Sequence, residues 1–561
     1  MIVYSPTIRG SGAISRAFTS PDGSMLAIAS TLPFLTNPPG RATYMGQRIH
    51  QRLALHHRGE ASPFAVFDHL RLPINEVSFH PFDPVIAVAA GSYDGGYMFE
   101  GELFLWDWQA DRSWLAVKSV PEVERCSFSE DGKRLDILVR PWNEEWGEGD
   151  DPFDRVYPLS LPYRQPGRAE MADVVIDPGQ AIVRHTLEFA TPDPNGHETT
   201  GKQLSEWFGV DELSSRGAIW DVAWLDDARI AAVHNDCLLE IHDLASGGVI
   251  SFKEDGRYGA DILRTSPPVI AVYDVSGWQI QRSRLLALLN DSLSEIITFE
   301  GCYNFASSKS GLVLGRLDRH RAGEAKADVI VDLETSDARF ADLGHYDCFN
   351  HFLGIDAAPD LFILQGRPET SHENKRLCRV HPDGAVEPLW PVLRADGSHA
   401  SHAMECLGCY VEDELGPGII MTGRHYDPDP NKGKRGFIFR KPIPSGDAAG
   451  GSLRSRWLRH ATADQEIWRF ATTAGASAIA HARKEGLILV AFLDGTLSLL
   501  SAADGVVVIT GQVTIEGLPT VIYCMDVVDG SLAVGTFDGR IAVIPFDQLR
   551  NCESIGRIEL A

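Results

Sequence analysis

The residues with the most chemical potential are histidines and cysteines in two segments, HYDCFNH and SHASHAMECLGC. Imidazole and thiolate groups are the ligands that zinc prefers in proteins. The two segments occupy corresponding places in neighbouring strand-rich units. If adjacent inner strands bring them together, they could form a metal site. The candidate ligands are His345, His351, His399, His402 and Cys406.

Packing is the alternative explanation for the cysteines, and we favour it. Several cysteines fall in the first apolar strand of a unit, where space is tight and a small apolar side chain fits. Cys406 and Cys409 would also point to opposite faces of a strand, because successive side chains alternate. We therefore expect core cysteines and no cofactor. The cysteines at such positions are Cys126, Cys302, Cys348, Cys406 and Cys524.

Two further motifs resemble ligand-binding loops but lack essential residues. DPDPNKGKRG begins at Asp427 with the spacing of a calcium loop, yet it has Lys432 where such a loop needs glycine. GHETTGKQ ends in Gln203, where a phosphate-binding loop needs a serine or threonine for magnesium. We expect a solvated loop tip for the first motif and the start of a helix for the second. No GxSxG nucleophile motif occurs, and no catalytic residue is predicted.

The loop PWNEEWGEGDDPFD is the main candidate for binding a partner. It places Trp142 and Trp146 among acids that include Glu144 and Glu145. Aromatic anchors dominate interface energetics, and an acidic surrounding suits a basic partner. The alternative is that both tryptophans pack against the nearest sheet while the acids face water.

The elements that must position these residues are short strands, most clearly between Thr520 and Leu549. Three β-rich runs are separated there by two Asp-Gly pairs, at 529–530 and 538–539. Asp-Gly between such runs predicts hairpins, because both turn positions accept positive φ. A sheet of this size must pack against others like it to be stable.

An internal repeat supports that expectation. Four predicted hairpins align on an aspartate that follows an apolar strand, with another apolar residue five positions later. Where neighbours are clear, the interval is about 40–55 residues, as in propeller blades. The aspartates are Asp236, Asp291, Asp494 and Asp538.

Three segments carry a resemblance to a known family: FTSPDGSMLAIAS, FSEDGKRLDILV and LFLWDW. A strand ending in Phe-Ser or Phe-Thr, an Asp-Gly turn, a small apolar strand and a closing Trp-Asp resemble the WD-repeat family. The Gly-His dipeptide of that family is not evident, so the blades are divergent. The resemblance implies an all-β fold, a β-propeller of four-stranded antiparallel blades. We count about nine or ten candidate units; seven or eight blades with insertions is the more usual arrangement, and two fused propellers are the alternative.

The chain divides into three predicted regions. Residues 1–167 contain N-terminal WD-like blades, and the first of these includes an excursion between Leu32 and Ser62. Residues 168–217 form a divergent segment with a helical insertion on the surface. Residues 218–561 contain the remaining blades. The short apolar start, Ile2–Tyr4, could close the last blade, because every ring must cover its final edge.

Composition limits the classes of function. The net charge of −26 over 561 residues repels phosphate backbones and anionic membranes, so we expect no nucleic acid and no membrane partner. No signal peptide and no long apolar run is evident, and nine scattered cysteines suit reduced thiols, so a cytoplasmic location is expected. The sequence thus predicts a non-catalytic protein-interaction scaffold. The alternative is a propeller enzyme or ligand-binding protein that uses the central channel, with a His/Cys metal site.

Overall fold

The computed structural model describes most of residues 2–560 and divides them into two compact units. One unit contains Met1–Ser5, 34–47 and 218–561, and the other contains Pro6–Pro33 and 48–217. We call them the ring unit and the inserted unit. The longer segments outside the description are 32–50, 141–154, 164–181, 184–195, 318–327, 344–352, 366–374, 390–406, 425–435 and 444–465, with shorter ones elsewhere.

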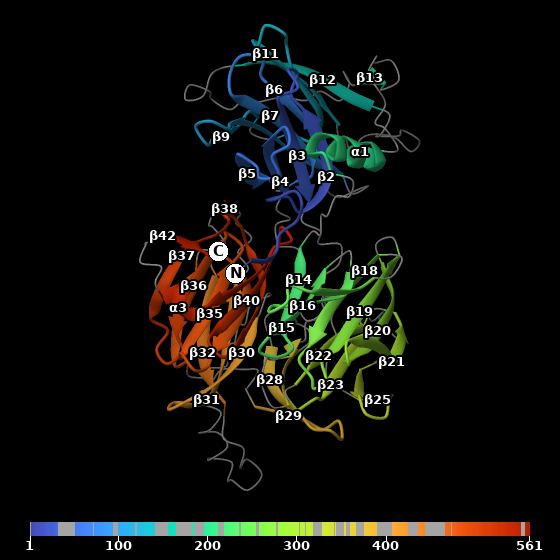
Figure 1. The fold of residues 1–561 in the computed structure, drawn as a ribbon, viewed down its shortest axis with the longest axis vertical. Coiled ribbons are helices and arrows are strands. Elements are labelled where there is room, and N and C mark those ends of the chain that lie inside the picture. Colours follow the sequence, from blue (N-terminus) through green and yellow to red (C-terminus); the bar gives the residue numbers. More distant parts are fainter. Residues whose placement is uncertain are drawn as a thin grey trace. The chain divides into compact units, whose positions relative to one another are not determined.

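The described residues form ten sheets, each with an antiparallel core of four strands connected in chain order or nearly so, and in one sheet β42 (Gly556–Glu559) adds a parallel pairing with β37 (Val507–Ile515) (Figure 1). Seven sheets belong to the ring unit and three to the inserted unit. The protein is therefore an all-β propeller protein built of four-stranded antiparallel blades, as the sequence predicts.

The first four blades of the ring unit follow the chain from its inner to its outer strand. Blade 1 contains β14 (Ile219–Trp224), β15 (Arg229–His234), β16 (Cys237–Asp243) and β17 (Val249–Phe252). Blade 2 contains β18 (Arg257–Leu263), β19 (Val269–Ser276), β20 (Gln279–Leu289) and β21 (Ser292–Glu300). Blade 3 contains β22 (Tyr303–Ser307), β23 (Val313–Leu317), β24 (Val329–Asp332) and β25 (Asp337–Phe340). Blade 4 contains β26 (Leu353–Gly354), β27 (Leu361–Gln365), β28 (Lys375–Val380) and β29 (Val386–Pro388).

The last three blades include the additions made by the chain termini. Blade 5 contains β30 (Gly408–Asp413), β31 (Gly416–Arg424), β32 (Gly436–Pro442) and β33 (Trp468–Thr472). Blade 6 contains β34 (Ala476–Ala482), β35 (Leu487–Phe492), β36 (Thr496–Ser501), β37 (Val507–Ile515) and β38 (Leu518–Pro519), joined by β42 (Gly556–Glu559). Blade 7 contains β39 (Ile522–Val528), β40 (Ser531–Thr536) and β41 (Ile541–Pro545), joined by β1 (Ile2–Tyr4) and followed by α3 (Phe546–Arg550).

The seven blades pack in a closed cycle. Each pair of consecutive blades shares one cluster of buried apolar side chains, from blades 1 and 2 through blades 6 and 7. A seventh cluster joins blade 7 back to blade 1, with Ile219 and Val222 packed against Cys524 and Ile541. Each blade thus buries apolar side chains of its described strands on both of its faces, against the two neighbouring blades.

The N-terminal strand completes blade 7. β1 pairs antiparallel with β41, through Ile2 with Ala542 and Tyr4 with Ile541. Val3 and Tyr4 also pack against the cluster between blades 7 and 1. The chain then leaves the ring after Ser5 and returns at Ala218 to begin blade 1, so the inserted unit lies in sequence between the closing strand and the first blade.

The inserted unit contains three blades in a row. The first contains β2 (Ala13–Thr19), β3 (Met25–Thr31), β4 (Gln51–His57) and β5 (Ala65–Leu70). The second contains β6 (Ile74–Phe79), β7 (Val85–Tyr93), β8 (Phe99–Asp107) and β9 (Arg112–Leu115). The third contains β10 (Val123–Phe128), β11 (Arg134–Val139), β12 (Arg155–Pro162) and β13 (Ile182–Val183). Two buried clusters join the three blades.

The predicted helix forms α1 (Gly196–Phe208), so the GHETTGKQ motif is a helix start, as expected. It is more than a surface insertion. Leu204 and Trp207 are buried against Ile8, Leu26 and Ile28, on the face of the first blade opposite the second. The helix thus covers an apolar sheet face that a closed ring would cover with another blade.

Two sequence expectations need correction. The excursion between Leu32 and Ser62 contains β4, a fully paired strand of the first blade. The repeat of aspartates is also not in register throughout. Asp494 and Asp538 lie between the second and third strands of their blades, whereas Asp291 lies between the third and fourth. An apolar strand followed by an Asp turn marks any antiparallel hairpin, so the pattern cannot tell one turn of a blade from another.

The turns of the two WD-like segments SPDG and SEDG share the same hydrogen bond and the same glycine conformation. In both SPDG and SEDG the serine hydroxyl donates to the aspartate, at 2.6 Å for Ser20 and Asp22 and 2.7 Å for Ser129 and Asp131. The glycine that follows has positive φ in each, 70° and 68°. Among the described residues, no helix is long and apolar enough to cross a membrane.

Candidate functional site

The candidate partner-binding and metal-ligating residues that the sequence indicates lie outside the described part of the chain. This holds for the loop residues Trp142, Glu144, Glu145 and Trp146 and for the loop that begins at Asp427. It also holds for His345, His351, His399, His402 and Cys406. The partner loop and the metal site therefore stay predictions. Within the described ranges, no group of three or more His, Cys, Asp or Glu side chains is arranged to hold a metal ion.

The cysteines that the structure describes are core residues. Cys126 lies in β10 and Cys524 in β39, each the first strand of its blade, and both are buried. Burial raises the pKa of the Cys126 thiol well above its usual value, so this side chain is an unreactive thiol. The packing interpretation is confirmed for these two positions.

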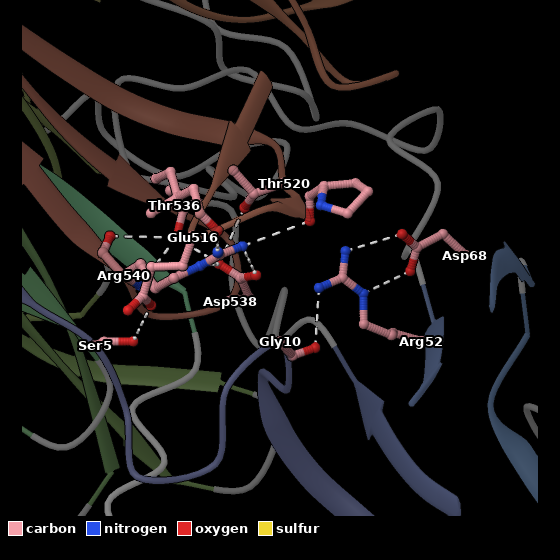
Figure 2. A network of polar contacts seen from close by, with 11 residues as sticks. Ser5, Gly10, Arg52, Asp68, Glu516, Thr520, Thr536, Asp538 and Arg540 are labelled. Atoms are coloured by element: carbon pink, nitrogen blue, oxygen red, sulfur yellow. Dashed lines mark hydrogen bonds and ion pairs between the residues drawn. The ribbon is translucent and has the colours of Figure 1, made fainter. Parts of the chain in front are cut away.

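One blade contains a buried polar network without the Gly-His dipeptide of WD repeats. In blade 7 the Asp538 carboxylate accepts hydrogen bonds from Thr520 and Thr536, at 3.0 Å and 2.6 Å (Figure 2). Its other oxygen lies 2.6 Å from the Arg540 guanidinium, and both side chains are fully buried. Arg540 also donates to the carbonyl of Ile515, which lies in blade 6. The network fixes one turn of blade 7 onto its neighbour and has no solvent access, so its role is structural.

The inserted unit has a comparable pair. Arg52, which is buried, donates through two nitrogens to Asp68 at 2.6 Å and 2.9 Å, and to the carbonyl of Gly10 at 2.9 Å (Figure 2). A guanidinium that donates two hydrogen bonds to one carboxylate fixes the relative orientation of the two side chains and also pairs their charges. The pair links the first blade to the chain segment around Gly10, which precedes β2. Its role, like that of the Arg540 network, is structural.

A different arrangement marks one place on the ring unit as a candidate binding site. Nine large apolar side chains of the described chain are exposed, and four of them come from adjoining segments of blades 5 and 6. We call these four residues the Arg440 patch, because Arg440 joins the segments that carry them. They are Leu415 (53% exposed), Ile467 (38%), Val506 (58%) and Val508 (53%).

Arg440 itself is completely buried in β32 and contacts both blades. Its guanidinium lies 2.6 Å from Asp413 and donates to the carbonyl of Gly416, at 3.2 Å, in the turn that carries Leu415. It also donates to the carbonyl of Ala502 in blade 6, at 2.9 Å. The backbone carbonyl of Arg440 accepts from Ile467 at 2.8 Å. The Arg440 side chain therefore joins two of the segments, and its backbone carbonyl holds the third, at Ile467.

Trp468 fixes the blade 6 side of the patch. Its indole donates to the same Ala502 carbonyl at 3.0 Å, and its ring lies against Gly505. A Cβ at Gly505 would come within 2.7 Å of that ring, and φ there is 73°, so only glycine fits. Val506 follows directly. The exposed valine is thus positioned by a glycine turn packed on a buried tryptophan.

The rim of the patch is acidic. Three of its carboxylates have arginine partners: Glu412 with Arg483 at 3.7 Å, Glu466 with Arg469 at 2.6 Å, and Asp413 with Arg440. Glu414 and Asp504 are exposed, and no described cation lies within ion-pair distance of either. Among the residues that the structure describes, the patch therefore combines apolar surface with excess negative charge.

Sequence reasoning missed this site because no single segment displays it. Leu415, Ile467 and Val506 each look like an ordinary isolated apolar residue beside a turn. The available signal was the pair of motifs EDELG and AADGV, in which acids adjoin an aliphatic residue in a glycine turn.

Comparisons with known proteins give no family. No family model matches, and no curated protein matches. Solved structures similar to this chain include the β-propeller domain of Cps50 (Swd1) from Myceliophteria thermophila, with a TM-score of 0.41, 11% identity, and coverage of 59% of this chain and 98% of that one. The WD40 β-propeller domain of Doa1 has a TM-score of 0.37 and 11% identity, covering 58% of this chain and 92% of its own. The computationally designed protein Ika8 has a TM-score of 0.35 and 9% identity, covering 58% and 96%.

These values are low, and the class rests on the sheets themselves. The chain is an all-β propeller protein whose blades resemble divergent WD repeats: seven blades close one ring, and three more form an inserted unit.

Proposed function

We propose that the protein is a non-catalytic scaffold that binds another protein through the Arg440 patch. The observation that carries this proposal is that exposed aliphatic side chains come from three segments that are joined by one buried residue, Arg440, through its guanidinium and its backbone carbonyl. Large apolar side chains exposed together mark interaction sites, whereas single ones are ordinary.

Rigid support also favours binding at this place. Leu415 and Val506 lie at turns whose backbones are fixed by Arg440 and Trp468, so little ordering is needed there when a partner docks. Binding residues commonly lie on loops held by such a scaffold. The buried thiols of Cys126 and Cys524 suit a reducing, cytoplasmic location, which we include in the proposal.

A site-specific photo-crosslinker tests the proposal in cells. We would place it at Leu415 and, as a matched control, at Phe340, which is 82% exposed on blade 3 of the same unit. We expect a discrete adduct from position 415 that the Ile467→Asp variant abolishes, and none from position 340. The captured protein, once purified, should bind the wild-type protein and fail to bind Ile467→Asp. Equal adducts from both positions, or binding unaffected by Ile467→Asp, would contradict the proposal.

A further inference from the structure

We infer that the partner segment bound by the Arg440 patch is aliphatic and carries lysine or arginine beside its apolar residues. This inference rests on the proposed docking function and adds the chemistry of the occupant. It commits to a segment of another protein, since a second copy of this chain would bring two acidic molecules with a net charge of −26 each together.

The apolar part of the argument comes from the distribution of exposed side chains. Outside the patch, the remaining exposed large apolar residues of the described chain are a neighbouring pair on β17, Val249 and Ile250, and three single residues. The patch combines side chains from separate segments of two blades. The four exposed side chains are all aliphatic, and aliphatic side chains on the occupant would make matching dispersion contacts with them.

The charge of the rim indicates which residues of the occupant lie beside its apolar residues. Arg440, Arg469 and Arg483 each have a carboxylate partner, and Glu414 and Asp504 remain as excess negative charge. Acidic occupant residues would be repelled, and basic ones attracted, by these two carboxylates. Complementary rim charges contribute specificity and association rate more than affinity.

Both sides of the patch keep their charge well below neutral pH. The Arg440 guanidinium lowers the pKa of the Asp413 carboxyl, and hydrogen bonds from Ser501 and the Val506 amide lower the pKa of Asp504. The acidic rim therefore does not disappear under mildly acidic conditions, and the preference for a basic occupant should hold there too.

Fluorescence anisotropy with defined peptides tests the inference. The probe is a short labelled peptide that alternates leucine or isoleucine with lysine or arginine, and its counterpart has glutamate at every basic position. We expect the full-length protein to bind the basic peptide, with affinity falling as salt is raised, and to bind the acidic peptide at least about tenfold more weakly. Equal binding of the two peptides would overturn the inference.

Matched variants separate the patch from the general acidity of the molecule. Leu415→Ser should weaken binding about fivefold, whereas Leu289→Ser, at a similarly exposed turn leucine of blade 2, should leave it unchanged. Asp504→Asn should weaken binding about two- to fivefold, and Glu414→Gln likewise. The control for Asp504 is Asp332→Asn, because Asp332 also accepts backbone hydrogen bonds in an exposed turn between the last two strands of its blade. If patch and control variants behave alike, the basic peptide binds elsewhere and the inference fails.

The two proposals fail in distinguishable ways. If the crosslinker at Leu415 captures a partner that Ile467→Asp loses, but Asp504→Asn and Glu414→Gln do not change its binding, the docking function stands and the basic chemistry is wrong. If no adduct forms at position 415 and no peptide binds, both are wrong.

Discussion

At the scale of single residues, buried ion pairs distinguish this chain from a purely apolar propeller. Arg540 with Asp538 and Arg316 with Asp328 are completely buried pairs in the ring unit. Removing one charge from such a pair leaves the other without compensation in an apolar environment, and the cost exceeds any net gain from the intact pair.

Arg540→Met should therefore be strongly destabilising. We expect a loss of about 3–5 kcal/mol in the free energy of unfolding of the ring unit, because Asp538 would remain buried and uncompensated. Arg229→Met, which removes a half-exposed pair with Asp226 and Asp291, should cost below about 1 kcal/mol. Urea unfolding followed by tryptophan fluorescence gives both values. Adding Asp538→Asn to Arg540→Met should recover part of the loss; an unchanged midpoint for the single variant would contradict the argument.

His56 makes the inserted unit sensitive to acid. Burial lowers its pKa from the usual 6.5 to about 4, against a smaller opposing effect of its hydrogen bond to the Glu60 carbonyl. The unfolded chain takes up a proton near 6.5 and the folded one only near 4, so stability falls as pH drops through this window. The loss should reach about 3 kcal/mol at pH 4. His56→Gln should reduce this dependence; equal slopes for the two proteins in urea unfolding between pH 7.5 and 4 would show that His56 does not contribute.

At the scale of elements, α1 and β1 complete surfaces that the blades leave open. α1 covers one face of the inserted unit, and β1 covers the outer edge of β41 in the ring. Both elements are short, and each contacts its sheet through few side chains.

Trp207→Ala should detach α1 from the first blade of the inserted unit. Trp207 packs against Ile8, Leu26 and Ile28, and truncation of such a buried aromatic side chain costs about 3–5 kcal/mol. The measurement is hydrogen exchange of peptides from α1 and β3, which should lose protection while blade 6 keeps it. Trp207→Phe retains much of the apolar contact and should lose far less. Protection of α1 that survives in Trp207→Ala would show that other contacts hold the helix.

The local elements could be predicted, and the contacts between distant ones could not. The Asp-Gly pairs at 529–530 and 538–539 form the expected turns, with φ of 82° and 84° at the glycines, because turn geometry depends on neighbouring residues alone. β4 was missed because QRLALHH includes Arg52 and His56, whose polarity indicates a loop. Both are buried, and Arg52 is compensated by Asp68, 16 residues later.

The Arg440 patch illustrates the same limit for a functional site. Its segments are separated by 52 residues between Leu415 and Ile467 and by 39 between Ile467 and Val506. They meet only because blades 5 and 6 pack face to face, and that packing depends on the whole ring.

At the scale of the whole molecule, the ring is a closed chain of seven interfaces. Each interface is an apolar cluster shared by two blades, and the last one, between blades 7 and 1, also contains Val3 and Tyr4 of the closing strand. The inserted unit has its own clusters, and none of its described strands pairs with a ring blade. We therefore expect the ring to fold without it.

Replacing residues 6–217 with a flexible linker of about 10 residues tests this expectation. The product keeps β1 and all seven blades, so it should remain soluble, with β41 protected from hydrogen exchange as in the full chain. Its matched control begins at Ala218 and lacks β1, which leaves the edge of β41 unpaired. We expect the control to lose protection in β41 and to unfold at a lower urea concentration, since pairing and the packing of Val3 and Tyr4 are lost together. If the two products behave alike, the closing strand adds nothing to the ring. If both fail to fold, the blades depend on the inserted unit or on residues 34–47 of the ring unit, which the replacement also removes, and the seven clusters do not suffice.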